Sequence, residues 1–467
     1  MTNTQSQAPA ATTVGELRKS GHVARSVRDE MRANLLDKLR AGDDPWPGIL
    51  GFSNTVLPQL ERALIAGHDV VLLGERGQGK SRLLRALVQL LDEWTPVIGG
   101  SELGEHPFDP ITPASIRRAA ELGDDLPVQW RHRDERYAEK LATPDTSVGD
   151  LVGDVDPVKV AEGRSLGDPE TIHFGLVPRA HRGIVAINEL PDLAERLQVA
   201  LLNVMEERDI QIRGYNLRLP LDVLLVASSN PEDYTNRGRI ISPLKDRFGA
   251  EVRTHYPLEL ADEVAVIAQE ARLEAVVPDV LLEIVARLTR HLRESPSVDQ
   301  RSGVSARFSI AAAETVSASA IHRAAVTGEP DAVARPVDLA TVIDVLGGKL
   351  EFESGEEGRE RDVLEHLLRR ATADAVQAHL GGIDMAGLVS ALETGPAVVT
   401  GERVPATELL DSLPDDDAVD ETAERLGATS DGERASAAEL ALEGLYLARR
   451  ISKDVEDSAA GGRTVYS

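Results

Sequence analysis

The sequence predicts an α/β domain followed by a helical region, and three observations lead to this prediction. The apolar run 70–73 has the pattern of a buried strand, and a glycine-rich loop and a helical pattern follow it directly. Two further apolar runs, at 183–187 and 223–227, end in polar residues, as expected of buried strands in an α/β sheet. From 259 to 346 the apolar residues recur with helical spacing instead. Strands that alternate with helices, and then helices alone, indicate an α/β domain and a helical one.

The glycine-rich loop at 74–81 reads Gly-Glu-Arg-Gly-Gln-Gly-Lys-Ser, which fits the phosphate-binding pattern G-x-x-x-x-G-K-S/T. Its glycines let the backbone N–H groups turn toward phosphate oxygens, and the helix that follows adds its positive N-terminal end. Lys80 would reach the β and γ phosphates, and Ser81 would offer its hydroxyl to Mg²⁺. The predicted nucleotide-binding residues are Gly74, Gly77, Gln78, Gly79, Lys80 and Ser81.

Two polar residues, Asn188 and Glu189, end the second apolar run. A second phosphate-site strand usually ends in Asp-Glu, where the aspartate holds the Mg²⁺ shell and the glutamate orients and deprotonates the attacking water. Glu189 is in place, whereas Asn188 replaces the aspartate and brings no negative charge. We therefore predict a Mg²⁺ site at Ser81 and Asn188, with weakened metal binding and hydrolysis as an open alternative.

The third apolar run leads to Asn230, whose amide at a strand end would touch the γ-phosphate or the water, although Asn before Pro is also a common turn signal.

The composition indicates a globular protein of several domains, because 42% of its 467 residues are hydrophobic and 28% are charged. A net charge of −27 argues against a broad nucleic-acid surface, and the absence of cysteine excludes disulfides and thiolate metal sites. No histidine pair has ligand spacing, so we predict no transition metal.

The order of the phosphate loop, Glu189, Asn230, Arg247 and Arg307 resembles that of AAA+ ATPases. The resemblance is strongest to the magnesium chelatase ATPase subunit and the MoxR proteins, and it extends over about residues 46–347. Four segments resemble the chelatase subunit's helix 2 insertion and the approach to its second strand: 142–145, 150–156, 175–177 and 180–183.

The resemblance implies a five-stranded parallel sheet with helices on both faces, a helical lid, and ATP bound between the subunits of a ring, commonly a hexamer. It implies that Glu189 is the catalytic carboxylate and that Asn230 is the first sensor. Arg247 would be the arginine finger that reaches a neighbour's ATP, with Arg239 as a rival, and Arg307 would be the second sensor. Each arginine has an ordinary alternative as a surface ion-pair residue.

The expected organisation is an N-terminal tail and helical extension at 1–45, an AAA+ α/β domain at 46–257, a helical lid at 258–347, and an acidic helical region at 348–467 with a disordered end from 457. The charged run 131–136 is interpreted as a solvated loop or strand end. The alternating segment 209–219 predicts a hairpin that resembles the family's pre-sensor insertion, in which Tyr215 would contact a pore or partner.

The function that this resemblance implies is ATP- and Mg²⁺-dependent remodelling or loading of a partner protein, with metal insertion or cofactor maturation as narrower possibilities. The expected partner carries a von Willebrand A domain. One alternative is a nucleotide-gated scaffold that hardly hydrolyses ATP, because Asn188 replaces the usual aspartate. The other is a DNA-associated transcriptional regulator or helicase-like ring, although the σ54-activator loop Gly-Ala-Phe-Thr-Gly-Ala is absent from the sequence. The polar N-terminus has no apolar signal core, so we expect a cytoplasmic protein without a membrane span.

Overall fold

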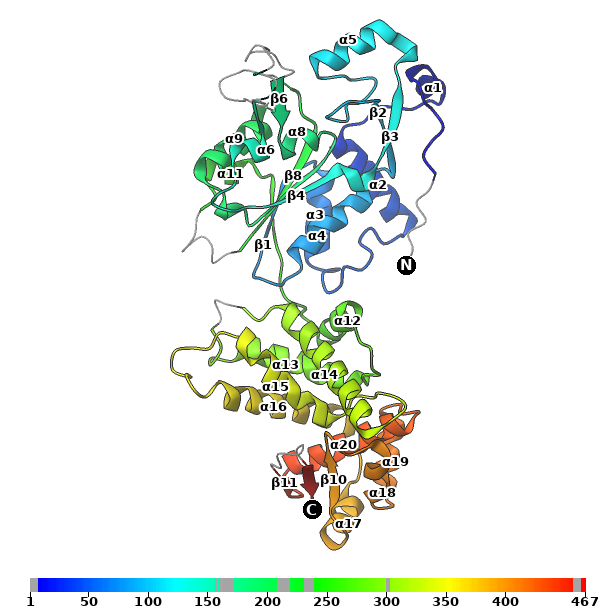
Figure 1. Ribbon diagram of the computed structural model, residues 1–467, viewed down its shortest axis with the longest axis vertical. Coiled ribbons are helices and arrows are strands. Elements are labelled where there is room, and N and C mark those ends of the chain that lie inside the picture. The colour runs from blue at the N-terminus through cyan, green and yellow to red at the C-terminus, as the bar shows by residue number, and fades with distance from the viewer. Residues whose placement is uncertain are drawn as a thin grey trace. The chain divides into compact units, whose positions relative to one another are not determined.

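The computed structural model describes residues 7–155, 158, 161, 171–207, 219–230, 239–299, 303–456 and 463–467. The chain forms two compact units, Met1–His255 and Tyr256–Ser467. The first unit contains the α/β sheet, and the second is mostly helical (Figure 1). Residues 209–218 of the predicted hairpin 209–219, including Tyr215, lie outside the described residues.

The first unit is built on a five-stranded sheet in the order β4-β7-β8-β1-β9, with every neighbouring pair parallel. Its strands are β1 (Val70–Leu73), β4 (Tyr137–Leu141), β7 (Gly183–Asn188), β8 (Val223–Ser229) and β9 (Ala250–Arg253). Because all strands run the same way, the residues that follow β1, β7 and β8 meet at the carboxyl edge of the sheet. The predicted five-stranded parallel sheet is confirmed.

Helices cover both faces of this sheet (Figure 1). Alternate residues along each strand point to opposite faces, so Val70 and Leu72 enter one core and Val71 and Leu73 enter the other. The first core includes residues of α2 (Val27–Ala41), α3 (Val56–Ile65) and α4 (Lys80–Ala86). The second core includes residues of α9 (Glu195–Glu207) and α11 (Ser242–Arg247).

Shorter elements complete the first unit. They are α1 (Val14–Lys19), α5 (Pro113–Leu122), α6 (Val148–Leu151), α8 (Leu176–Arg179), β2 (Trp94–Ile98), β3 (Val128–His132), β5 (Gly153–Val155), β6 (Ile172–Phe174) and the 3₁₀ turns Leu87–Leu90, Gly123–Asp125, Arg133–Arg136 and Leu190–Asp192. Strands β2 and β3 form one antiparallel pair, and β5 and β6 form another.

The interpretation of 131–136 as a solvated segment is wrong for Arg136, whose side chain is only 1% exposed. Its guanidinium makes a two-pronged ion pair with Glu30 on α2, with both N···O distances at 2.7 Å. It also donates from Nε to the carbonyl oxygen of Arg182 at 2.8 Å. A buried charge needs a partner, and Glu30, which is distant in sequence but adjacent in space, provides it. This pairing allows Arg136 to be buried.

The second unit packs a bundle of helices around one core. Its helices are α12 (Leu260–Glu270), α13 (Asp279–Glu294), α14 (Ala306–Thr327), α15 (Thr341–Leu346), α16 (Glu360–Leu380), α17 (Ala386–Thr394), α18 (Ala406–Ser412), α19 (Asp417–Arg425) and α20 (Asp431–Leu447), with 3₁₀ turns at Pro336–Ala340 and Gly347–Lys349. This agrees with the predicted helical region that follows the α/β domain.

The expectation of a disordered end is wrong for residues 463–466, which form strand β12 (Arg463–Tyr466). This strand pairs antiparallel with β10 (Val398–Gly401) and β11 (Lys453–Glu456). Tyr466 is buried, and its hydroxyl donates to Glu443 at 2.5 Å. Pairing with β10, which is distant in sequence, provides backbone hydrogen bonds for β12 and allows the Tyr466 ring to be buried. The local composition of residues 457–467 does not reveal this pairing.

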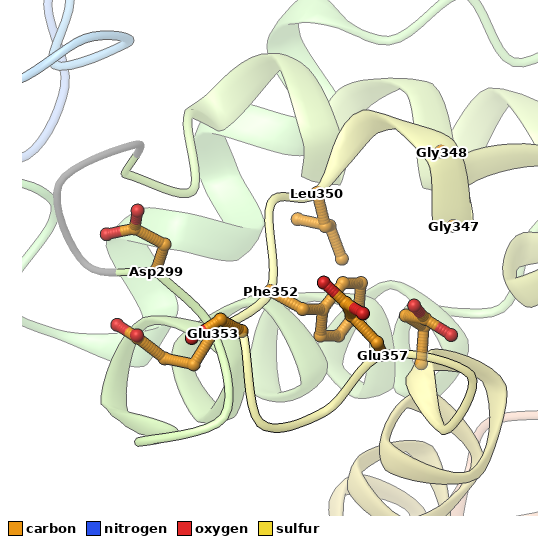
Figure 2. Close-up of a pocket in the computed structure, with 9 residues that line it drawn as sticks. Asp299, Gly347, Gly348, Leu350, Phe352, Glu353 and Glu357 are labelled. Carbon is orange, nitrogen blue, oxygen red and sulfur yellow. The ribbon is translucent and has the colours of Figure 1, made fainter.

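A hollow of about 660 Å³ lies in the second unit. Figure 2 shows carboxylates of Asp299, Glu353 and Glu357 around the apolar side chains of Leu350 and Phe352. None of the described residues that line it is basic, so none of them supplies the positive charge that a phosphate site needs. In the described ranges, no helix combines the length and apolar content needed to cross a bilayer.

Buried His181 predicts a pH dependence of the first unit's stability. Burial, and then the charge of Arg182, lowers the pKa of His181 to about 4, and the Asp222 N–H donates to its Nδ1 at 3.1 Å. The unfolded chain accepts a proton at this histidine near pH ~6.5, whereas the folded chain does not until about pH 4. The contribution of neutral His181 to the unfolding free energy is therefore complete above pH ~6.5 and is lost as the pH falls toward ~4.

We expect the loss of unfolding free energy between about pH 7 and 4 to be smaller in His181→Gln than in the wild type, by about 3 kcal/mol. Glutamine keeps an oxygen that accepts the Asp222 N–H but does not titrate. Urea unfolding at several pH values measures the difference. Parallel stability curves for the two proteins would contradict this origin of the pH dependence.

Candidate nucleotide-binding site

The loop between β1 and α4 has a backbone that requires glycine at several positions. Gly77 and Gly79 have positive φ angles of 76° and 74°, in the left-handed region that other residues seldom adopt. At Gly74 a Cβ atom would lie 2.0 Å from Thr254 Oγ1 and 2.3 Å from Gln78 Oε1. The loop is therefore shaped by glycines both through backbone angle and through close packing.

Gln78 braces this loop from inside. Its Oε1 accepts the Glu75 N–H at 3.0 Å and the Thr254 hydroxyl at 2.9 Å. Thr254 follows β9, and its own N–H donates to the carbonyl oxygen of Leu73 at 2.7 Å. The Gln78 side chain thus fastens the loop to the sheet, a role that the sequence pattern alone did not reveal.

The Lys80 ammonium group lies inside the loop at the carboxyl edge of the sheet. It donates to the carbonyl oxygens of Gly74 and Glu75, the latter at 2.8 Å, and to Asn230 Oδ1 at 2.6 Å. The side chain is buried, so this positive charge is held where water has little access. A phosphate group brought to the loop would meet a desolvated cation.

Glu189 and Asn230 lie together at the same edge. Asn230 Nδ2 donates to Glu189 Oε2 at 2.8 Å, so one amide connects the Lys80 ammonium with the Glu189 carboxylate. Glu189 has a left-handed backbone, with φ 55° and ψ 49°, which is uncommon for a residue with a side chain. Its N–H donates to Ser228 Oγ at 3.3 Å. Such strained residues are concentrated at functional sites.

Asn188 and Ser81 present oxygen atoms to each other. Asn188 Oδ1 accepts from Ser81 Oγ at 3.4 Å and from Ser228 Oγ at 3.1 Å. Hydroxyl and carboxamide oxygens are ligands that Mg²⁺ accepts directly or through its bound waters. These residues therefore fit a Mg²⁺ ion held together with nucleotide phosphates, although neither carries a charge.

Sequence reasoning missed a carboxylate next to Asn188, that of Glu139 on β4. Asn188 Nδ2 donates to Glu139 Oε1 at 2.6 Å, while Arg85 donates to both carboxylate oxygens at 2.8 and 2.9 Å. The Arg85 hydrogen bond, with the Tyr137 hydroxyl and the Asn188 amide, lowers the pKa of Glu139. The segment 137–141 has no clear apolar alternation, so only its pairing with β7 could have identified it.

Two of the predicted arginines, Arg247 and Arg239, lie elsewhere in the first unit. Arg247 ends α11, is 44% exposed and pairs with Glu206 on α9. Arg239 is exposed, and its backbone carbonyl accepts from Gln198 Nε2 at 3.0 Å. Arg307 is exposed on α14 in the second unit. Their assignment to catalysis therefore rests on the proposed assembly.

Comparison with known proteins finds one matching domain family and several similar magnesium-chelatase subunits. The Sigma-54 interaction domain family matches residues 163–247. Magnesium-chelatase subunit ChlI of Anabaena variabilis is 29% identical over 215 residues, which cover 45% of this chain and 60% of that protein. The chloroplastic ChlI of Nicotiana tabacum is 29% identical over 249 residues, covering 52% and 54% respectively. The chain spans about half to three-fifths of the length of these curated relatives.

Solved structures give more distant matches. NtrX from Brucella abortus in complex with ADP is 16% identical, covers 77% of this chain and 72% of its own, and has a TM-score of 0.41. A structure of the complex between magnesium chelatase subunits BchI and BchD contains a chain that is 22% identical, with coverages of 69% and 98% and a TM-score of 0.36. The chain therefore combines a parallel sheet and a phosphate loop with sequence similarity, over about half of its length, to magnesium-chelatase subunit ChlI.

Proposed function

We propose that this chain binds ATP with Mg²⁺ and hydrolyses it. The observation that carries the proposal is the chain of hydrogen bonds from the Lys80 ammonium through Asn230 to the Glu189 carboxylate. It joins a phosphate-binding cation to a carboxylate that can accept a proton, at the carboxyl edge of a parallel sheet where ligands of such folds bind.

Each residue of the cluster has a role in this reaction. Lys80 exchanges its carbonyl partners for β- and γ-phosphate oxygens, and Ser81 and Asn188 hold Mg²⁺ or its waters. Bound Mg²⁺ supplies positive charge that neutralises the phosphates. Glu189 orients the attacking water and accepts its proton, and Asn230 fixes the direction of that carboxylate. The loop braced by Gln78 keeps the phosphate site in shape before nucleotide arrives.

We extend the proposal to a ring, commonly of six chains, that remodels or loads a partner protein. Arg247 is suited to act as the finger because its exposed ion pair with Glu206 contributes little stability and is readily exchanged for a neighbour's phosphate. Arg307 would act from the lid as the second sensor. The partner would carry a von Willebrand A domain, and magnesium chelatase-type metal insertion or cofactor maturation is the narrower reading.

A second candidate is a nucleotide-gated scaffold that binds ATP and turns it over very slowly. The neutral Asn188 in contact with Ser81 favours it, because a carboxamide attracts a divalent cation less than a carboxylate does. The match to the Sigma-54 interaction domain family favours a third candidate, a DNA-associated regulator. The acidic composition, with a net charge of −27, gives that alternative less support.

Assembly in response to nucleotide tests the ring. We expect light scattering to show growth from one chain to about six chains when ATP and Mg²⁺ are added to the wild type. Lys80→Ala should keep the mass of a single chain under the same conditions, because its loop lacks the cation that holds the phosphates. A wild type that binds ATP without any change in mass would contradict the ring, and equal assembly by Lys80→Ala would contradict the role of the loop.

A further inference from the structure

The carboxamide of Asn188 has two chemically different ends, and its surroundings determine which end faces Ser81. The oxygen accepts hydrogen bonds from Ser81 and Ser228, and the nitrogen donates to Glu139. A rotated amide would place its oxygen against the Glu139 carboxylate, where two acceptors repel. Glu139 thereby keeps the Asn188 oxygen directed toward Ser81.

The Glu139 carboxylate is itself held firmly. Arg85 on α4 donates to it with Nε and Nη2, and the Tyr137 hydroxyl donates to it at 3.1 Å. The Glu139 side chain is 20% exposed, and the Arg85 guanidinium balances its negative charge. This carboxylate lies one hydrogen bond from Asn188, on the strand next to β7.

We propose that Glu139 is a positioning residue that fixes, from the neighbouring strand, the orientation of the Asn188 amide for Mg²⁺-nucleotide binding. This inference rests on the proposed ATP and Mg²⁺ site. Glu139 acts through the Asn188 amide: it keeps the carboxamide oxygen, and not the amide nitrogen, directed toward Ser81. The hydrogen bond that it accepts from the amide nitrogen also polarises the carboxamide toward its oxygen.

This arrangement makes a specific prediction about the two residues together. Asn188→Asp alone restores the usual aspartate but places two carboxylates side by side, and their repulsion should weaken rather than improve metal binding. Glu139→Gln alone leaves an amide against an amide, so either end of Asn188 can face Ser81. The double variant Glu139→Gln with Asn188→Asp exchanges the two groups and restores one carboxylate and one amide.

The experiment is equilibrium binding of a fluorescent ATP analogue to the full chain, measured with Mg²⁺ and with EDTA. The ratio of the two affinities gives the part that depends on the metal. We expect Glu139→Gln and Asn188→Asp each to reduce this ratio by about 10- to 100-fold. The double variant should recover most of the loss. Glu121→Gln, which changes an exposed glutamate of α5, is the matched control and should behave as the wild type.

The outcomes separate this inference from the proposed function. If the wild type shows no Mg²⁺-dependent binding, the proposed site and this inference both fail. If the wild type binds in this way and Glu139→Gln keeps the same ratio, only the role of Glu139 is overturned. If Glu139→Gln lost the same affinity for the ATP analogue in Mg²⁺ and in EDTA, Glu139 would have a merely structural role. The same conclusion would follow if the affinity ratio of the double variant were no higher than that of either single variant. Thermal unfolding of each variant accompanies the measurement.

Discussion

Replacing Glu189 by glutamine should lower steady-state ATP turnover by about 10²- to 10⁴-fold. Glutamine has nearly the same shape and can keep a hydrogen bond to Asn230, whose amide now contacts Glu189 Oε2 at 2.8 Å. It cannot accept the proton of the attacking water. The bonds of Lys80 to the loop and to Asn230 do not involve Glu189, so ATP affinity should change little.

Turnover by phosphate release and binding by a fluorescent ATP analogue, measured on the same preparation, test this expectation. Glu121→Gln again serves as the matched charge-removing control. If Glu189→Gln lost binding and turnover in equal measure, Glu189 would belong to the binding site rather than to the hydrolytic step. If turnover survived, another group would have to be the base.

The second large effect concerns stability. Arg136→Met should lower the unfolding free energy of the first unit by about 3 to 5 kcal/mol, because it leaves the Glu30 carboxylate buried without its cation. Both side chains are almost fully buried, at 1% and 2% exposure. Methionine preserves much of the volume, so the loss arises from the unpaired charge and from the missing donors to the Arg182 carbonyl.

Two further variants identify the cause. The double variant Glu30→Gln with Arg136→Met removes the unpaired charge yet keeps an acceptor for the Asp92 N–H, so it should be more stable than Arg136→Met alone. Arg40→Met breaks an exposed pair with Asp37 and should cost at most about 1 kcal/mol. Urea unfolding measures all three. A double variant less stable than the single one would contradict the charge argument.

The sequence contained enough information for the central strands and the loop. The runs at β1, β7 and β8 are apolar because both faces of the sheet are covered, and a buried strand is readable from its composition alone. The sheet was confirmed, as was the likeness to the magnesium chelatase subunit. The assignments of Lys80, Glu189 and Asn230 to catalysis remain proposals supported by their mutual hydrogen bonds.

Other features depend on contacts between segments far apart in the chain, and these have no local signal. Glu139 looks like a surface residue until β4 pairs with β7 and brings it to Asn188. Arg136 looks solvated until Glu30 meets it from α2. Residues 463–466 look disordered by composition, but they form a strand because they pair with β10, which lies far away in the sequence. Tertiary pairing overrides local composition in each case.

Steady-state ATP hydrolysis by the wild type in the presence of Mg²⁺ tests the central claim most directly, with Lys80→Ala as the blank. We predict measurable turnover that disappears in the blank, because the Lys80 ammonium is the buried cation of the phosphate loop. ATP that binds but is not hydrolysed would contradict the claim of an ATPase. It would instead support a nucleotide-gated scaffold in which Asn188, even with Glu139 beside it, does not sustain hydrolysis.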